Sequence, residues 1–292
     1  MWVPDACAAR GAVAGAIAGL VLGSALLIAQ GSRPLNLLRV DRSGTSVKLG
    51  TLRGDAFALR VSPDGRRIVY DTGDSSIWIA ELSNLSTPHR LATGRFPMWS
   101  ADGTRVLFVA ANSSGVQQLF WQSADASGDP ELLVPIARSP ESWFPDGQTF
   151  TYITLKNLGD YDVWSFSLRD RTAKPLVAIE GTAQLSSRVS PDGRWIAYQQ
   201  IESDGDGIYV EPVPSTGERT RIAAGQRPVW TPDGMEIFFD HDGAMNVVSI
   251  ATSPRLTIGT PLRLPITNFI QGFGRRTYDL TPDGRYFLML SR

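Results

Sequence analysis

Short runs of apolar, β-branched and aromatic residues alternate with polar turns along most of this chain, a pattern typical of β-strands. One phrase recurs six times: a large apolar residue, a short polar turn with Asp-Gly, and a second apolar run. Its copies are "VSPDGRRIVY" from Val61, "WSADGTRVLFV" from Trp99, "WFPDGQTFTYI" from Trp143, "VSPDGRWIAYQ" from Val189, "WTPDGMEIFFD" from Trp230 and "LTPDGRYFLML" from Leu280. Because Asp and Gly tolerate the positive φ angles of tight turns, each copy predicts a β-hairpin.

The spacing of these hairpins predicts the architecture. Their turn aspartates follow one another at intervals of 38 to 50 residues, which is the size of a propeller blade. After each hairpin come a polar loop, a third strand, a polar turn and a short fourth strand; the third strands centre on Trp78, Phe120, Trp164, Tyr209 and Val247. Four strands per unit and six units predict an all-β, six-bladed propeller with four-stranded blades.

The last unit has only two strands before Arg292. Residues 35–50, "LNLLRVDRSGTSVKLG", read as strand, turn and strand, which matches the missing pair. We therefore expect these amino-terminal strands to complete the last blade and close the ring without a free sheet edge. The expected propeller domain is residues 33–292.

Residues 11–32 contain no ionisable side chain and would span about 33 Å as a helix, close to the thickness of a hydrocarbon core. They predict a transmembrane signal anchor after a short tail, residues 1–10; a cleaved signal peptide is the alternative. Glycines recur every fourth residue at Gly11, Gly15, Gly19 and Gly23, so one helix face is smooth enough for a homodimer. Chance spacing in an Ala/Gly-rich segment is the other explanation.

Charge and cysteine content narrow the function. The formal net charge is −1 and the basic residues are scattered, so no nucleic-acid partner is expected. The single cysteine, Cys7, permits neither an intrachain disulfide nor a cysteine-based metal site. Basic residues are more numerous after residues 11–32 than before them, and a positive-inside count alone would keep the propeller in the cytoplasm.

Other candidate chemistry is sparse. His89 and His241 lie in polar loop stretches and are interpreted as solvated residues. The acidic stretches 202–207 and 240–243 lack the ligand spacing of a calcium loop, so no metal and no cofactor are expected. Trp99, Trp143 and Trp230 occupy positions where other units have Val or Leu, which indicates packing between blades.

The "SPDG" unit followed by an apolar strand, with an aromatic-rich third strand, resembles the TolB-type propeller repeat over essentially all of residues 35–292. "VDRSG" after the apolar segment and "SIATSPRLTIGTPLRL" with "TYDLTPDGRYFLML" near the end are similar to the extracytoplasmic propellers of bacterial membrane sensor serine/threonine kinases. The resemblance implies a single-pass protein of the bacterial inner membrane with its propeller in the periplasm.

This resemblance comes without catalytic signatures. The chain has no kinase phosphate loop, His-Arg-Asp or Asp-Phe-Gly motif and no Gly-x-Ser-x-Gly elbow. We therefore expect a non-enzymatic, membrane-anchored module for binding, sensing or scaffolding in the cell envelope. The alternative is a sensory or accessory domain separated from a serine/threonine kinase or a prolyl-oligopeptidase-like hydrolase, whose activity lies on another chain.

The candidate ligand-binding residues lie just before the turn phrases, on the strands expected nearest the propeller axis. Arg60 and Arg188 fall in the first and fourth units, opposite each other in a six-fold ring, and Asp279 falls in the sixth. Two guanidinium groups facing across a funnel could bind a carboxylate or phosphate, with Asp279 orienting one of them. The expected partner is a protein or a small anionic ligand. The alternative is that Arg60 and Asp279 form a structural ion pair between blades.

Overall fold

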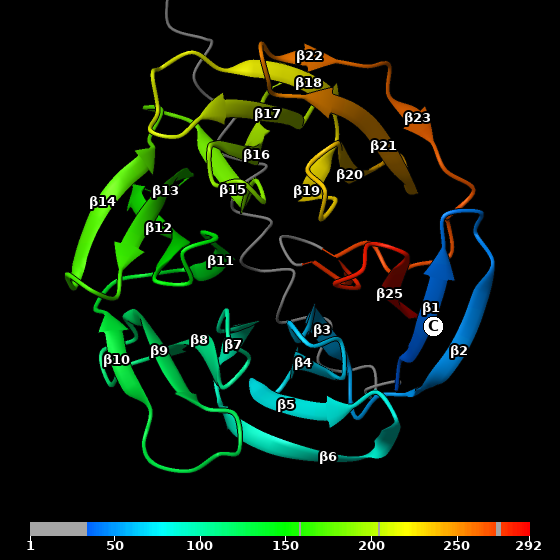
Figure 1. Cartoon of the computed structure of the whole chain (residues 1–292). Helices are drawn as coiled ribbons and strands as arrows, with labels where there is room; N and C mark the ends of the chain where they lie inside the picture. The colour runs from blue at the N-terminus through cyan, green and yellow to red at the C-terminus, as the bar shows by residue number, and fades with distance from the viewer. Residues whose placement is uncertain (1–33, 158, 204, 273–275) are drawn as a thin grey trace, which may run out of the picture. The chain divides into compact units, whose positions relative to one another are not determined.

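The computed structural model describes residues 34–157, 159–203, 205–272 and 276–292, and every regular element in these ranges is a β-strand. The strands form antiparallel sheets arranged as a ring around a central axis (Figure 1). In each unit the first strand lies nearest the axis and the last lies on the rim. The predicted all-β propeller is confirmed, and residues 34–292 form one compact unit.

The sheets follow the order of the chain. The first contains β3 (Ala56–Val61), β4 (Arg67–Thr72), β5 (Ser76–Glu81) and β6 (Asn84–Thr93). The second contains β7 (Arg95–Trp99), β8 (Arg105–Ala111), β9 (Gln117–Ser123) and β10 (Glu131–Val134). An eight-stranded sheet follows, with β11 (Ser139–Trp143), β12 (Thr149–Asn157), β13 (Asp160–Ser167), β14 (Thr172–Val177), β15 (Ala183–Val189), β16 (Trp195–Ile201), β17 (Gly207–Pro212) and β18 (Thr220–Ala224).

The remaining strands complete the ring. The next sheet contains β19 (Gln226–Trp230), β20 (Glu236–His241), β21 (Ala244–Ala251), β22 (Thr257–Ile258) and β23 (Leu262–Arg263). The last contains β24 (Tyr278–Leu280), β25 (Tyr286–Ser291), β1 (Asn36–Asp41) and β2 (Ser46–Thr51).

The described strands therefore form five hydrogen-bonded sheets, where the sequence predicted six separate four-stranded ones. The difference arises between β13 and β15, which pair in parallel through Tyr161 and Ala183. This pairing joins two antiparallel halves, β11–β14 and β15–β18, into the eight-stranded sheet. Sequence repetition could not show it, because it depends on how closely two neighbouring units approach.

The ends of the chain meet in the last sheet. Strand β1 pairs antiparallel with β25 in an unbroken register from Asn36 opposite Ser291 to Asp41 opposite Tyr286, and β2 covers the outer edge of β1. Leu37 in β1 is fully buried with Leu288 and Leu290 of β25. The prediction that residues 35–50 complete the last unit is confirmed.

Side-chain hydrogen bonds build the repeated hairpin turns. In the first turn, Ser62 Oγ donates to Asp64 Oδ1 and accepts from the backbone N–H of Arg67, while Asp64 also accepts from the backbone N–H of Arg66. The Ser/Thr-to-Asp bond recurs at Ser100–Asp102, Ser190–Asp192, Thr231–Asp233 and Thr281–Asp283. Phe144 replaces the hydroxyl residue in the third turn, where Asp146 instead binds Gln148 and Thr149.

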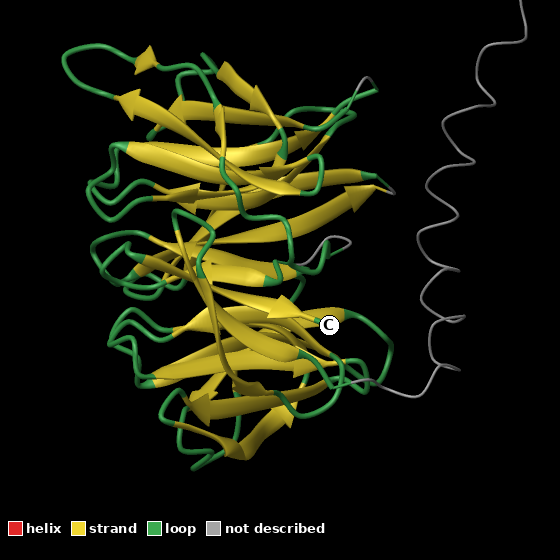
Figure 2. Ribbon diagram, turned by 90° about the vertical axis from the view of Figure 1, so that its right-hand side faces the viewer, coloured by secondary structure: helices red, strands yellow, loops and turns green. Residues whose placement is uncertain are grey.

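The six turns contact one another in a cycle, so they share one face of the propeller, which we call the turn face. Each turn glycine lies against the residue just before the Asp of the preceding turn, Pro in five cases and Ala101 in one. At the tightest contact, a Cβ added to Gly284 would lie 2.8 Å from Pro232 Cδ. Gly284 also has a φ of 71°, so the turn and the packing both require glycine there. Viewed from the side, the loops gather at two opposite ends of the strands (Figure 2).

The core lies between neighbouring units. Buried side chains of adjacent strand sets form six hydrophobic clusters within the described residues. One joins β1 and β25 to β3 and β4 through Leu37, Leu59 and Tyr70. Each unit is therefore stabilised mainly by its neighbours, as expected for a repeat protein.

The predicted tail and transmembrane helix, residues 1–10 and 11–32, lie outside the described residues, as does the proposed glycine dimer face. In the part of the chain that the structure describes, no helix is long and apolar enough to cross a bilayer.

Candidate binding site on the propeller axis

An irregularity in the inner strands shapes the axial site. The register to the second strand shifts between Phe57 and Arg60 in β3 and between Leu185 and Arg188 in β15, and β7, β11 and β19 show the same shift. Ala58 and Ser186, inside these bulges, have φ angles of 43° and 55°. A bulge bends and twists its strand and redirects the adjacent side chain. Arg60 and Arg188 each directly follow such a bulge.

A cavity of about 280 Å³ opens on the turn face; we call it the axial cavity. Trp143 and Trp230 line it, together with the turn prolines Pro145, Pro191, Pro232 and Pro282. Arg188 and Asp279, two of the predicted site residues, also line it. Apolar walls with a few charged groups are characteristic of binding pockets.

The three tryptophans of the turn phrases form hydrogen bonds between neighbouring inner strands. Trp99 Nε1 donates to Arg60 O at 3.3 Å, Trp143 Nε1 to Trp99 O at 2.7 Å and Trp230 Nε1 to Arg188 O at 3.0 Å. Trp99 and Trp230 are buried, which agrees with their interpretation as packing residues. Trp143 and Trp230 also line the axial cavity, so these two side chains both pack between units and form part of the cavity wall.

Arg188 is held on one side only. Its Nη1 donates to the backbone carbonyls of Glu141 and Ser187 and lies 3.7 Å from Glu141 Oε2. The Glu141 carboxylate accepts a hydrogen bond from Ser139 Oγ at 2.5 Å. All three of these contacts of Arg188 use Nη1, so one side of the guanidinium is fixed in a residue that also lines the axial cavity.

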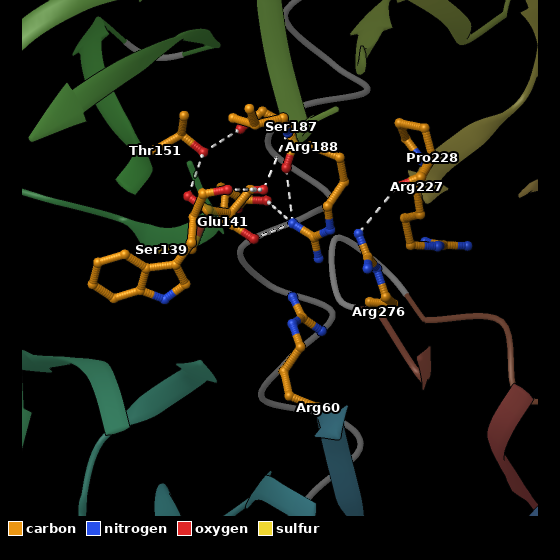
Figure 3. A network of polar contacts seen from close by, with 12 residues as sticks. Arg60, Ser139, Glu141, Thr151, Ser187, Arg188, Arg227, Pro228 and Arg276 are labelled. Atoms are coloured by element: carbon orange, nitrogen blue, oxygen red, sulfur yellow. Dashed lines mark hydrogen bonds and ion pairs between the residues drawn. The ribbon is translucent and has the colours of Figure 1, made fainter. Parts of the chain in front are cut away.

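Arg60 does not form the expected alternative ion pair with Asp279. Its Nη1 donates to the carbonyl of Leu59 at 3.0 Å, and its buried Nε has no hydrogen-bond partner among the described residues. Figure 3 shows the Arg60 side chain pointing from its inner strand toward the guanidinium groups of Arg188 and Arg276. Arg60 and Arg188 therefore extend from different inner strands toward the same region of the axis.

Asp279 contacts other groups than those predicted. Its Oδ2 accepts the backbone N–H of Val61 at 3.0 Å, which links the last sheet to the first. Its Oδ1 lies 3.5 Å from Arg276 Nη1. The arginine that Asp279 approaches is thus Arg276, and Asp279 also stabilises the ring closure.

Arg276 is a member of the site that sequence reasoning missed. It is 4% exposed, its Nη2 donates to Pro228 O at 3.2 Å, and its Nε is buried without a partner in the described structure. The site residues predicted from the sequence all lie directly before a turn phrase, whereas Arg276 lies three residues earlier than Asp279. The basic pair Arg275-Arg276 in "GRRTYDL" was the available signal.

The site carries an excess of positive charge. Burial, reinforced by the charge of Arg60, lowers the pKa of Arg276 to about 10. Burial and then the charges of Arg276 and Arg60 lower the pKa of Arg188 well below its ordinary value. Charged arginines in such surroundings are destabilised by desolvation and mutual repulsion.

Arg227 offers a contrast on the neighbouring strand β19. It is 3% exposed, but Nε donates to Asp240 Oδ2 at 2.7 Å and Nη2 lies 2.5 Å from the same oxygen. Its backbone carbonyl accepts from Tyr278 Oη at 2.8 Å. Arg227 is therefore a paired structural arginine, unlike Arg60, Arg188 and Arg276.

The other sequence candidates lie elsewhere. His89 Nε2 is 2.9 Å from the carbonyl of Ala124, and the exposed His241 lies 3.4 Å from Asp242. The acidic stretches 202–207 and 240–243 both border a second cavity of about 200 Å³. Within the described ranges, no group of three or more His, Cys, Asp or Glu side chains is suitably placed for a metal ion.

No protein-family model and no curated protein matches the chain. Solved structures do match it. A protein assigned as TolB from Agrobacterium tumefaciens superposes with a TM-score of 0.68 at 18% sequence identity, over 89% of this chain and 99% of that one. TolB from Acinetobacter baumannii gives a TM-score of 0.59 at 16% identity, over 99% of this chain and 71% of that one. The chain has the fold of a TolB-type β-propeller.

The expectation of a non-enzymatic chain needs correction. An oligogalacturonate lyase in complex with manganese matches this TolB-type propeller with a TM-score of 0.57 at 15% identity, over 84% of this chain and 79% of that one. The missing kinase and hydrolase motifs excluded only those two kinds of enzyme, whereas a propeller can carry catalytic groups on its own strands and loops. The fold therefore does not exclude catalysis, and no enzymatic role is established for this chain.

Proposed function

We propose that this protein is a binding module of the bacterial cell envelope that holds a segment of another protein in the axial cavity. The observation that carries the proposal is the combination of Trp143, Trp230 and four turn prolines on the walls with Arg188 and Asp279 beside them. Rigid aromatic and proline surfaces bind an extended segment with little loss of conformational entropy, while the charged groups orient it. The TolB-type fold supports this role by analogy.

The proposal includes six functional units around the axis. Six turns in one cycle of glycine contacts and six clusters between units support this count, although one pairing joins two units into a single sheet. Arg60, Arg188 and Asp279 are the proposed ligand-contacting residues of the first, fourth and sixth units. A small anionic ligand, rather than a protein segment, is the alternative occupant.

We further propose that residues 11–32 anchor the chain in the inner membrane and place the propeller in the periplasm. The apolar length of this segment and the resemblance to sensor-kinase propellers support this topology. Digestion of the propeller by protease in spheroplasts, but not in intact cells, is the expected result. Protection in spheroplasts, with digestion only after lysis, would contradict the periplasmic placement.

The glycine face of the same segment is proposed to form a homodimer. Replacing Gly15 and Gly19 with Leu should abolish self-association in a membrane reporter assay, because the larger side chains prevent close approach of the two helix backbones. An unchanged signal would rule out this dimer.

Site-specific photo-crosslinking tests the binding role. In this test, p-benzoylphenylalanine replaces Phe144, an aromatic residue that lines the axial cavity, in the full-length chain, and living cells are irradiated. Val116 carries the same crosslinker in the control; it is 39% exposed and lies in the loop between β8 and β9, at the end opposite the turn face. A partner captured at position 144 alone, whose purified form loses affinity for a Trp230→Ala variant, is expected. Equal capture at both positions, or binding that is independent of Trp230, would contradict the proposal.

A further inference from the structure

Arg60, Arg188 and Arg276 come from separate parts of the chain and converge on the axis. Arg60 and Arg188 lie on the inner strands β3 and β15, and Arg276 lies just before the inner strand β24. The Arg60 side chain points toward the guanidinium groups of Arg188 and Arg276 (Figure 3), and the charges of these arginines act on one another. Like charges converge in this way at low solvent exposure only where other interactions compensate their repulsion.

The protein supplies incomplete compensation. The Nε atoms of Arg60 and Arg276 are buried and have no partner in the described residues. The carboxylates of Glu141 and Asp279 lie 3.7 Å from Arg188 and 3.5 Å from Arg276, beyond the usual length of a charged hydrogen bond. Arg227 shows what full compensation looks like in the same chain, because its Nη2 lies 2.5 Å from Asp240.

The balance of charges in the cluster indicates which kind of ligand would fit it. Three guanidinium groups face two carboxylates in the described part of the chain, which leaves an excess of one positive charge. A monoanion would neutralise it, whereas a phosphate monoester with two charges would leave a buried negative excess. A carboxylate is also planar and accepts paired hydrogen bonds from guanidinium.

We propose that Arg60, Arg188 and Arg276 bind a single carboxylate group at the inner end of the axial cavity. Arg188 connects this arginine cluster to the cavity, because it lines the cavity and belongs to the cluster. This inference rests on the proposed function, since it assigns the charged end of the bound segment. The carboxylate belongs either to a chain terminus or to an acidic side chain of that segment.

The first test compares two small probes on the full-length chain at constant ionic strength. Indole-3-acetate carries a carboxylate and an aromatic ring of a size suited to the Trp143 and Trp230 walls, and indole-3-acetamide is its neutral counterpart. Isothermal titration should show at least about tenfold tighter binding of the acid, since one charged hydrogen bond contributes that much. Inorganic phosphate should bind more weakly than the acid.

Variants assign the effect to the cluster. Arg188→Gln and, separately, Arg60→Gln should reduce the preference for the acid at least about tenfold. Arg53→Gln is the matched control, because Arg53 is an exposed arginine stacked on Trp78 away from the axial cavity. Circular dichroism and the melting temperature confirm folding; if Arg188→Gln fails to fold, the result with Arg60→Gln decides.

The outcomes separate this inference from the proposed function. Equal binding of acid and amide, stronger binding of phosphate, or an unchanged preference in the folded variants would overturn the carboxylate site, even if crosslinking still identifies a partner. Absence of binding by both probes would also overturn it. Peptides Ac-Gly-Pro-Ala with a free or an amidated terminus, and Ac-Gly-Asp-Ala-amide, then distinguish a terminal carboxylate from an acidic side chain.

Discussion

Gly65, in the first hairpin turn, lies against Pro282 of the last turn, so that a Cβ added at Gly65 would come within 3.4 Å of Pro282 Cδ. The two residues are more than 200 positions apart in the chain, yet their contact has the same form as those between consecutive turns. The Pro-Asp-Gly phrase therefore has a tertiary role besides the hairpin. Its glycine makes room for the residue before the Asp of the preceding turn, and prolines of four of these turns, Pro145, Pro191, Pro232 and Pro282, line the axial cavity.

The glycine contacts predict a difference between two substitutions. Gly284→Ala should lower the free energy of unfolding by about 1 kcal/mol, because alanine is strained at a positive φ. The added Cβ would also clash with Pro232, which should lower the free energy of unfolding further. Gly115→Ala is the matched control, since Gly115 has a φ of 79° but nothing within 4 Å of an added Cβ. Urea denaturation measures both variants. Equal destabilisation would show that the turn contact contributes nothing.

Ring closure predicts strong sensitivity in β1. Leu37→Asp should destabilise the propeller by more than about 4 kcal/mol, because Leu37 is fully buried between β25 and the first sheet and its replacement would be an unpaired buried charge. Val47→Asp on β2 is the control, since Val47 is 49% exposed. We expect the first variant to aggregate or melt early and the second to melt near the wild-type temperature. Similar melting of both variants would contradict closure through β1.

The two kinds of buried arginine should respond differently to truncation. Arg227→Met leaves Asp240 buried without its partner and should cost about 3–5 kcal/mol. Arg276→Met removes the hydrogen bond to Pro228 O but also relieves the repulsion with Arg60, so we expect a cost of about 1 kcal/mol or less. Chemical denaturation of the two variants measures the difference. A larger loss for Arg276→Met would show that Arg276 is a structural residue.

The turn aspartates predict loss of stability in acid. The pKa of Asp64 is held below its ordinary value first by the Ser62 hydroxyl, and Thr231 and Thr281 do the same for Asp233 and Asp283. A lowered folded-state pKa contributes stability that is fully present above the unfolded pKa of about 3.9 and is lost as the pH falls through the folded pKa. The melting temperature should therefore fall below about pH 4.

A triple variant isolates this effect. Asp64→Asn, Asp233→Asn and Asp283→Asn together should lower the melting temperature at pH 7 and flatten its decline between about pH 4 and pH 2, since Asn does not titrate. An unchanged decline would assign the acid sensitivity to other carboxylates.

The sequence by itself determined the local architecture. Alternating apolar positions and Asp-Gly turns specify hairpins through short-range backbone preferences, and an unmatched strand pair at each end predicts closure by sheet pairing. The hairpins and the closing strand pair both depend on interactions within one sheet. For the same reason, Arg60 and Arg188 could be placed on inner strands from their positions in the repeated phrase.

Only the tertiary structure decided how the units meet. The β13–β15 pairing, the Asp279 contact with the backbone of Val61 and the convergence of Arg276 on Arg60 all join different units. Such contacts depend on the rotation and spacing of neighbouring sheets and on bulges that redirect side chains, which a repeated phrase does not encode position by position. The arginine cluster exists because the inner strands β3 and β15 and the segment just before β24 bring its members to one axis.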